Sequence, residues 1–204
     1  MCTKTVFFYI YHMANIAIFA SGNGTNAENI IRYFADSSSI KIAAVFSNKE
    51  KAPVLEKAKN LQVPAFYFKR EDFSNGYPIL EILHKLHIDG ICLAGFLCMV
   101  SPVLLKAFPK RIINIHPSLL PKFGGKGMYG LNVHRKVIEN AEKESGITIH
   151  YIDEHYDQGE IICQETCPVL PTDTPEELAS RVHSLEYKYY PLVIERIFSP
   201  QEKV

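Results

Sequence analysis

The sequence predicts an α/β protein built on a single doubly wound, mostly parallel sheet flanked by helices. Short continuous apolar runs alternate with stretches whose apolar residues recur at helical spacing, which is the order of repeated strand–helix units. A glycine-rich turn follows the first apolar run. The chain has 204 residues, 47% of them hydrophobic and 22% charged, so it can form one compact domain with a buried core.

The first half of the chain predicts four strands separated by three helices. The expected strands are residues 16–20, 40–46, 63–68 and 90–94, and the expected helices are residues 27–34, 53–60 and 77–86. The strand at 90–94 is apolar throughout, which is typical of a strand buried on both faces of a parallel sheet.

The second half predicts a further strand, a loop and a strand pair. We expect a capped helix at 101–108, a strand at 111–116, a helix at 131–141, paired strands at 147–152 and 160–169, and a terminal helix at 174–197. Residues 117–130 are rich in Pro, Gly and Lys, which favours a ligand-contacting loop. No internal repeat or linker divides the chain.

The N-terminus differs from the rest. Residues 1–14 are expected to form an N-terminal extension, and residues 15–204 one domain. The apolar run VFFYIY is too short to span a bilayer. Because Met13 directly precedes the first predicted strand, the first twelve residues are either a peripheral extension or the product of an upstream start codon.

Charge and cysteine content limit the partners. Lys plus Arg and Asp plus Glu both number 22, so we expect neither a nucleic-acid nor a membrane partner. The five cysteines are an odd set without a CxxC motif, which indicates reduced thiols and a cytoplasmic protein. Cys163 and Cys167 have the spacing of a zinc pair, but no second pair completes a tetrahedral site, so we expect no metal.

The turn SGNGTN, residues 21–26, is a candidate anion site. Its glycines permit positive φ, and the predicted helix after it directs free N–H groups and a partial positive charge at the turn. The spacing matches neither the dinucleotide nor the P-loop motif, so a single phosphomonoester fits better. Alternatively, the turn only links strand to helix, with Thr25 or Asn26 capping the helix.

Asn114, His116 and Asp157 are candidate catalytic residues. Asn114 and His116 point to the same side because alternate residues of a strand share a face. An asparagine amide and a protonated histidine can both stabilise an oxyanion, as acyl transfer to an amine requires. Asp157 lies in a polar turn between two predicted strands, from which its carboxylate would favour the protonated form of His116.

Other interpretations of these residues remain open. Asn114 and Asp157 also suit ordinary turns, and His116 also suits a hydrogen-bonded, partly buried histidine. His134 and His150 are assigned to structural roles on a predicted helix and strand, although three histidines and an aspartate would also suit a metal site. No serine or cysteine lies beside a base, which favours direct amine attack over an acyl-enzyme.

Five segments between about residue 15 and residue 198 match one family pattern: NIAIFASGNGTN, LAGFLCMVSP, INIHPSLLPKF, GITIHYIDEHYDQGEII and SRVHSLEYKYYPLVI. Together they resemble the folate-dependent glycinamide ribonucleotide formyltransferases. INIHPSLLP followed by DxxxDQG is specific to the wider formyltransferase family, and SGNGTN narrows the resemblance to the glycinamide ribonucleotide branch. The resemblance implies a Rossmann-like formyltransferase fold, with residues 15–204 as the formyltransferase domain.

The resemblance also implies roles for individual residues. Asn114, His116 and Asp157 match the family's catalytic trio. The residues expected to bind the ribonucleotide, the first three of them through its phosphate, are Gly24, Thr25, Asn26 and Glu186. The residues expected to line the folate pocket are Arg70, Leu97, Cys98, Met99, Val100 and Asn114.

The implied reaction is formyl transfer in purine biosynthesis. The small-molecule partners would be glycinamide ribonucleotide and 10-formyltetrahydrofolate, the latter a cosubstrate, with no metal and with a monomer or homodimer as the active form. The amine would attack the formyl carbon directly while Asn114 and His116 stabilise the oxyanion. Asp157 would keep His116 charged and help to move protons.

Two features depart from the family pattern. Cys98 stands where many relatives have an arginine, and residues 124–130 lengthen the loop after the catalytic strand, with Lys126 as a candidate charge contact. Rival activities are formyltetrahydrofolate hydrolysis, transfer to methionyl-tRNA and binding of a phosphate or nucleotide without catalysis. The first two families usually carry an extra domain, for which this chain has little length left, and the third would need the trio to be idle.

Overall fold

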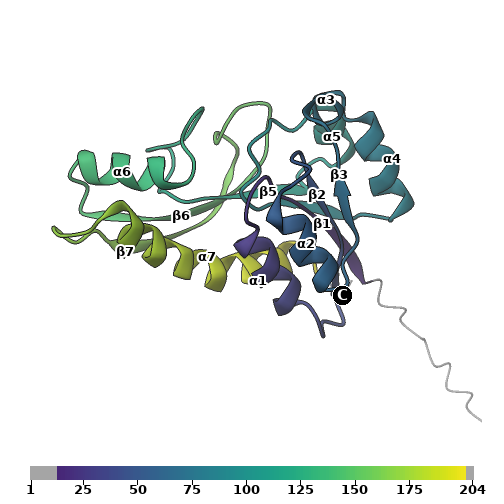
Figure 1. The fold of residues 1–204 in the computed structure, drawn as a ribbon, viewed down its shortest axis with the longest axis horizontal. Coiled ribbons are helices and arrows are strands. Elements are labelled where there is room, and N and C mark those ends of the chain that lie inside the picture. Colours follow the sequence, from purple (N-terminus) through teal and green to yellow (C-terminus); the bar gives the residue numbers. More distant parts are fainter. Residues whose placement is uncertain (1–12, 201–204) are drawn as a thin grey trace, which may run out of the picture.

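The computed structural model describes residues 13–200, which form one mixed sheet covered by helices (Figure 1). In this range, seven strands follow the order β3-β2-β1-β4-β5-β6-β7. The strands from β1 to β5 pair in parallel, and β6 and β7 are antiparallel. The predicted doubly wound, mostly parallel α/β sheet is confirmed.

The strands are β1 (Ala14–Phe19), β2 (Ile40–Ser47), β3 (Ala65–Tyr67), β4 (Gly90–Leu93), β5 (Ile112–His116), β6 (Glu144–Tyr151) and β7 (Ile161–Pro168). The helices are α1 (Thr25–Tyr33), α2 (Pro53–Asn60), α3 (Arg70–Asn75), α4 (Tyr77–Lys85), α5 (Pro102–Ala107), α6 (Leu131–Glu139) and α7 (Pro175–Phe198). Every predicted strand and helix has a counterpart, and α3 was not predicted. The predictions for residues 1–12 lie outside the described residues.

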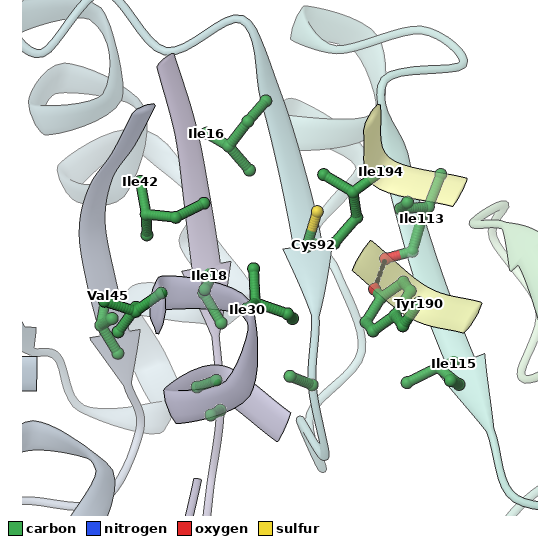
Figure 2. Close-up of a cluster of buried hydrophobic side chains, with 14 of the residues drawn as sticks. Ile16, Ile18, Ile30, Ile42, Val45, Cys92, Ile113, Ile115, Tyr190 and Ile194 are labelled. Carbon is green, nitrogen blue, oxygen red and sulfur yellow. Dashed lines mark hydrogen bonds between the residues drawn. The ribbon is translucent and has the colours of Figure 1, made fainter. Parts of the chain in front are cut away.

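Helices cover the sheet on both faces because its central strands are apolar on both sides. One core joins the sheet to α1, α2, α6 and α7, and the other joins it to α3, α4 and α5. Figure 2 shows part of the first core, where Ile18 of β1 lies beside Ile30 of α1. In the same view Cys92 of β4 lies beside Ile194 and Tyr190 of α7. No helix in residues 13–200 is long and apolar enough to cross a membrane.

An aromatic cluster fills the second core. The ring of Phe19 lies 5.1 Å from that of Phe46 and 5.5 Å from those of Phe73 and Phe96, measured between centroids. Phe73 and Phe96 are themselves 4.8 Å apart in a tilted arrangement. These offset and edge-on contacts are the geometries that aromatic rings prefer, and they fix the position of Phe96 beyond the end of β4.

The strand order changes direction at β1, which lies between β2 and β4. The chain moves outward from β1 to β3 on one side and then continues from β4 on the other side. In open α/β sheets, ligands bind beyond the carboxyl ends of the strands at such a point. The loops after β1, β4 and β5 therefore meet at the expected place for a site, while α6 and the β6–β7 pair extend to one end of the molecule (Figure 1).

Candidate active site

A cavity of about 650 Å³ opens at the carboxyl ends of the central strands. A smaller cavity of about 60 Å³ adjoins it and shares Phe96, Asn114, Tyr156 and Asp157 with it. All the residues predicted from the sequence to bind a substrate or to take part in the reaction line one or both of these cavities. Those lining the larger cavity are Gly24, Thr25, Asn26, Arg70, Leu97, Asn114, His116, Asp157 and Glu186. Those lining the smaller one are Cys98, Met99, Val100, Asn114 and Asp157.

The β1 loop, residues 21–26, forms one wall of the larger cavity. Gly24 is the N-cap of α1 and has a left-handed backbone, with φ of 73°, and no side chain caps the helix. The alternative that Thr25 or Asn26 caps α1 is therefore wrong, because both residues lie within the helix itself. A side chain at position 24 would overlap Val54 of α2. Glycine at this position thus lets the loop pack on α2 and leaves the helix N-terminus uncapped.

Glu186 of α7 closes the β1-loop side of the cavity. It is 4% exposed, and its Oε2 accepts hydrogen bonds from Asn26 Nδ2 at 2.9 Å and from His183 Nδ1 at 2.6 Å. The hydrogen bond to Glu186 raises the pKa of His183, while burial opposes this shift. The carboxylate is thereby held in place by a neutral donor and by a histidine whose protonated form it favours.

Asn114 is oriented by a histidine on the neighbouring strand. In the antiparallel register Asn114 lies opposite His150, and its Nδ2 is 3.2 Å from His150 Nε2. His150 Nδ1 is 2.8 Å from the carbonyl oxygen of Tyr151, so this nitrogen carries the proton and donates. Burial lowers the pKa of His150. A neutral His150 therefore accepts from the Asn114 amide and leaves the second amide N–H of Asn114 for a ligand.

His116 has protein atoms at both ring nitrogens. Its Nε2 donates to the carbonyl oxygen of Phe123 at 2.8 Å, and its Nδ1 lies 3.6 Å from Asp157 Oδ2. The latter distance is within the range of an ion pair but is too long for a hydrogen bond. The His116 side chain is 5% exposed and that of Asp157 14%, so the two groups interact in a largely water-free setting.

Asp157 links three parts of the site. Its Oδ2 accepts a 2.8 Å hydrogen bond from the backbone N–H of Gly125, and its Oδ1 lies 3.7 Å from His150 Nε2. Asp157 also has a left-handed backbone, with φ of 55°. That conformation is unusual for a residue with a side chain, and aspartate tolerates it better than most. The polar turn predicted from the sequence thus brings the carboxylate back over β5.

The 124–130 loop covers the cavity from the side of α6. Lys126, Tyr129 and the glycines on either side of them line the cavity, and Lys126 is exposed. Gly125, Gly127 and Gly130 have positive φ, and a Cβ at any of these positions would meet nothing within 4 Å. Glycine is required there by backbone conformation and not by close packing.

Three histidines near the site were given no functional role from the sequence. His134 of α6 is 2% exposed and lines the cavity, its Nδ1 has no partner, and burial lowers its pKa to about 4. His183 also lines the cavity, and His150 contacts Asn114. For His150 a signal existed, because polar residues alternate with isoleucines in β6 as they do in β5. The positions of His134 and His183 depend on how α6 and α7 pack.

No group of three or more His, Cys, Asp or Glu side chains within residues 13–200 is arranged to hold a metal ion. The Cys98 thiol, at the wall of the smaller cavity, has its pKa raised by burial, which outweighs the opposite effect of Arg70 and Lys49. A thiol held in its neutral form is a poor nucleophile. The donors that line the larger cavity include amide, imidazole and backbone groups together with the guanidinium of Arg70 and the ammonium of Lys126.

Comparisons with known proteins agree with this geometry. A family model described as formyl transferase matches residues 14–194. The chain is 41% identical to the chloroplastic phosphoribosylglycinamide formyltransferase of Arabidopsis thaliana, over 88% of this chain and 63% of that protein. It therefore spans less than two thirds of this plant relative.

A phosphoribosylglycinamide formyltransferase of Haemophilus influenzae is 40% identical, over 89% of this chain and 86% of that protein. Among solved structures, glycinamide ribonucleotide transformylase 1 of Geobacillus kaustophilus has a TM-score of 0.84 at 35% identity, over 92% of this chain and 100% of that one.

Proposed function

The chain belongs to the formyl transferase family, and we propose that it transfers the formyl group of 10-formyltetrahydrofolate to the amine of glycinamide ribonucleotide. The observation that carries the proposal is the convergence of the uncapped N-terminus of α1 with Asn114, His116 and Asp157 on one cavity. A phosphate on the first and an acyl group beside the others would be held within a single enclosed space. Relatives named for this activity support the choice of substrates.

The ribonucleotide would bind along the β1 loop. The free N–H groups at the start of α1 suit its phosphate, because they are donors without a side-chain cap and carry the positive end of the helix dipole. Glu186 is rigidly held next to Asn26 and has lone pairs for hydroxyl or amide donors of the substrate. Gly24, Thr25, Asn26 and Glu186 are thus the proposed ribonucleotide contacts.

The folate would bind at the β4 loop, residues 94–100, and extend into the smaller cavity. Leu97, Met99 and Val100 offer apolar surface for the pterin, and Arg70 supplies a cation at the cavity wall. Cys98 occupies this wall as a neutral thiol. Asn114 lines both cavities and would therefore lie where the formyl group and the amine meet.

In the proposed reaction the uncharged amine attacks the formyl carbon and negative charge develops on the formyl oxygen. The free amide N–H of Asn114 and the Nε2–H of His116 donate to this oxygen. His116 becomes available when its Nε2–H leaves the carbonyl oxygen of Phe123. Asp157 stabilises the imidazolium, and the proton lost by the amine reaches the folate nitrogen as the carbon–nitrogen bond to folate breaks, with water as carrier.

The proposal also covers the compartment and the active form of the enzyme. The cysteines at positions 92, 98, 163 and 167 are free thiols, which suits a reducing compartment, and we place the enzyme in the cytoplasm. We take the active form to be a monomer or a homodimer that needs neither a metal nor a nucleic acid.

The test follows folate absorbance after 10-formyltetrahydrofolate is mixed with the purified protein, with and without glycinamide ribonucleotide. We expect turnover to require the ribonucleotide and to fall by about 10²-fold or more in His116→Ala. His84→Ala, at an exposed position on α4, is the matched control and should keep wild-type turnover.

Each other outcome contradicts the proposal in its own way. Equal folate consumption without the ribonucleotide would establish a hydrolase. Binding of both ligands without turnover would establish a noncatalytic module, and wild-type turnover in a folded His116→Ala protein would exclude the trio.

A further inference from the structure

Hydrogen bonds tie together the loops that follow β1, β2 and β4 behind the cavity wall. Ser21 Oγ donates to Asn48 Oδ1 at 2.6 Å and accepts from the backbone N–H of Leu97 at 2.8 Å. Asn48 Nδ2 in turn donates to Cys98 Sγ at 3.1 Å. The backbone N–H of Ser21 also donates to the carbonyl oxygen of Gly95 at 3.0 Å. The amide of Asn48 is thus used at both ends.

These bonds connect the walls of the two cavities. Leu97 lines the larger cavity and Cys98 the smaller, while Gly22, next to Ser21, begins the part of the β1 loop that lines the larger one. Ser21 and Asn48 do not line either of these cavities, so they are not in a position to touch a ligand there. Ser21 is 1% exposed and Asn48 is half-buried, so these bonds are partly shielded from water. Partly buried polar bonds of this kind fix geometry because breaking one leaves an unpaired group.

We propose that Asn48 is a positioning residue for both substrates, acting through Ser21 on the β1 loop and through Cys98 on the β4 loop. This inference rests on the proposed function, in which the β1 loop binds the ribonucleotide and the β4 loop binds the folate. Asn48 sets the spacing between the two loops, so that the amine and the formyl group meet at Asn114. Loss of its amide lowers the affinity for both substrates and leaves the catalytic trio in place.

The main experiment measures kcat and the KM for each substrate in Asn48→Ala. We expect both KM values to rise by about tenfold, the effect of losing one or two partly buried hydrogen bonds. The value of kcat at saturation should stay within about threefold of wild type, because Asn114, His116 and Asp157 are unchanged. Asn140→Ala is the control, since the Asn140 amide bonds only to the Lys136 carbonyl among the hydrogen bonds described, at the end of α6 and outside both cavities.

A second pair of variants separates positioning from mere stability. Cys98→Ala removes the acceptor for Asn48 Nδ2, whereas Cys98→Ser keeps one. We expect Cys98→Ala to raise the KM for the ribonucleotide by about threefold or more, although Cys98 lines only the smaller of the two cavities, and Cys98→Ser to restore it. In the Asn48→Ala background, Cys98→Ala should cause no further rise in that KM, because the two residues act through one bond.

Three results would overturn the inference. One is a lower melting temperature in Asn48→Ala with both KM values unchanged, which would make the bonds purely structural. Another is a change in the folate KM alone. The third, which applies even if Asn48→Ala does not fold, is an unchanged ribonucleotide KM in Cys98→Ala. Since all three presuppose a wild-type enzyme that turns over, they leave the proposed function standing; absence of turnover in the wild type would instead reject that function.

Discussion

The cavity has two walls of opposite construction. The β1 and β4 loops are tied by partly buried side-chain hydrogen bonds and backed by packed helices and aromatic rings, and Gly24 lies directly against Val54. The 124–130 loop is partly exposed, most of all at Lys126 and Tyr129. Its backbone hydrogen bonds are local, apart from the Gly125 N–H, which anchors it to Asp157. The first wall is preorganised, and the second depends on Asp157, a residue proposed to take part in the chemistry.

The largest expected effect is a loss of turnover when Asp157 is substituted, because this residue belongs to the proposed trio and also anchors the 124–130 loop. Asp157→Asn keeps an acceptor for the Gly125 N–H and tolerates the left-handed backbone, but it removes the negative charge that faces His116. We expect kcat to fall by about 10²-fold or more with a melting temperature close to wild type. Steady-state kinetics and thermal unfolding measure this. Wild-type kcat in Asp157→Asn would show that the carboxylate serves the loop alone.

Glycine substitutions test the contrast directly. Gly24→Ala combines left-handed strain with overlap on Val54, so we expect a loss of about 2–4 kcal/mol in unfolding free energy and a higher ribonucleotide KM. Gly125→Ala carries the strain alone, because its Cβ meets nothing within 4 Å, and should cost about 1 kcal/mol. Urea titration of both variants gives the comparison. Equal losses would mean that the two walls are equally packed.

Two tyrosine hydroxyls, one buried in the core and one on the exposed loop, allow a similar comparison. Tyr190 is fully buried, and its hydroxyl is 2.9 Å from the carbonyl oxygen of Leu93 and 3.2 Å from that of Ile113, the bond drawn in Figure 2. We expect Tyr190→Phe to lower the unfolding free energy by about 1–2 kcal/mol. Tyr129→Phe, on the exposed loop, should change it by less than about 0.5 kcal/mol. Equal losses of unfolding free energy for the two variants in a denaturant titration would contradict this prediction.

The smallest expected effect is a pH dependence from α7. The pKa of His183 is raised by its hydrogen bond to Glu186, so the pair stabilises the folded state below the unfolded value near 6.5. This contribution is lost as pH rises through the raised folded pKa. It should be small because the His183 side chain is 47% exposed. As pH rises from the unfolded to the folded pKa of His183, the melting temperature of the wild type should fall slightly and that of His183→Ala should not. Parallel curves of melting temperature against pH for the two proteins would show that the His183–Glu186 pair is not the cause.

The parallel sheet could be predicted from the short apolar runs, because a strand that is buried on both faces of a sheet is apolar throughout. Helix α3 was missed because REDFSN is short and polar and becomes a helix only where Phe73 meets the aromatic cluster. The proposed trio could be predicted because Asn114 and His116 share a strand face and Asp157 lies in a recognisable turn. For His150 the alternation in β6 indicated the strand face, but its contact with Asn114 depends on the strand register. The contacts of Asn48 could not be predicted, since they depend on which loops become neighbours.

Phe96 belongs to both the interior and the site. Its ring packs against Phe19 and Phe73 and also lines both cavities. A smaller residue at this position would enlarge the room for a ligand and at the same time hollow out the aromatic cluster. Substrate range and thermal robustness are therefore coupled at position 96. Evolution of a broader specificity is expected to proceed through the exposed side chains of the 124–130 loop, Lys126 and Tyr129, which belong to neither hydrophobic core.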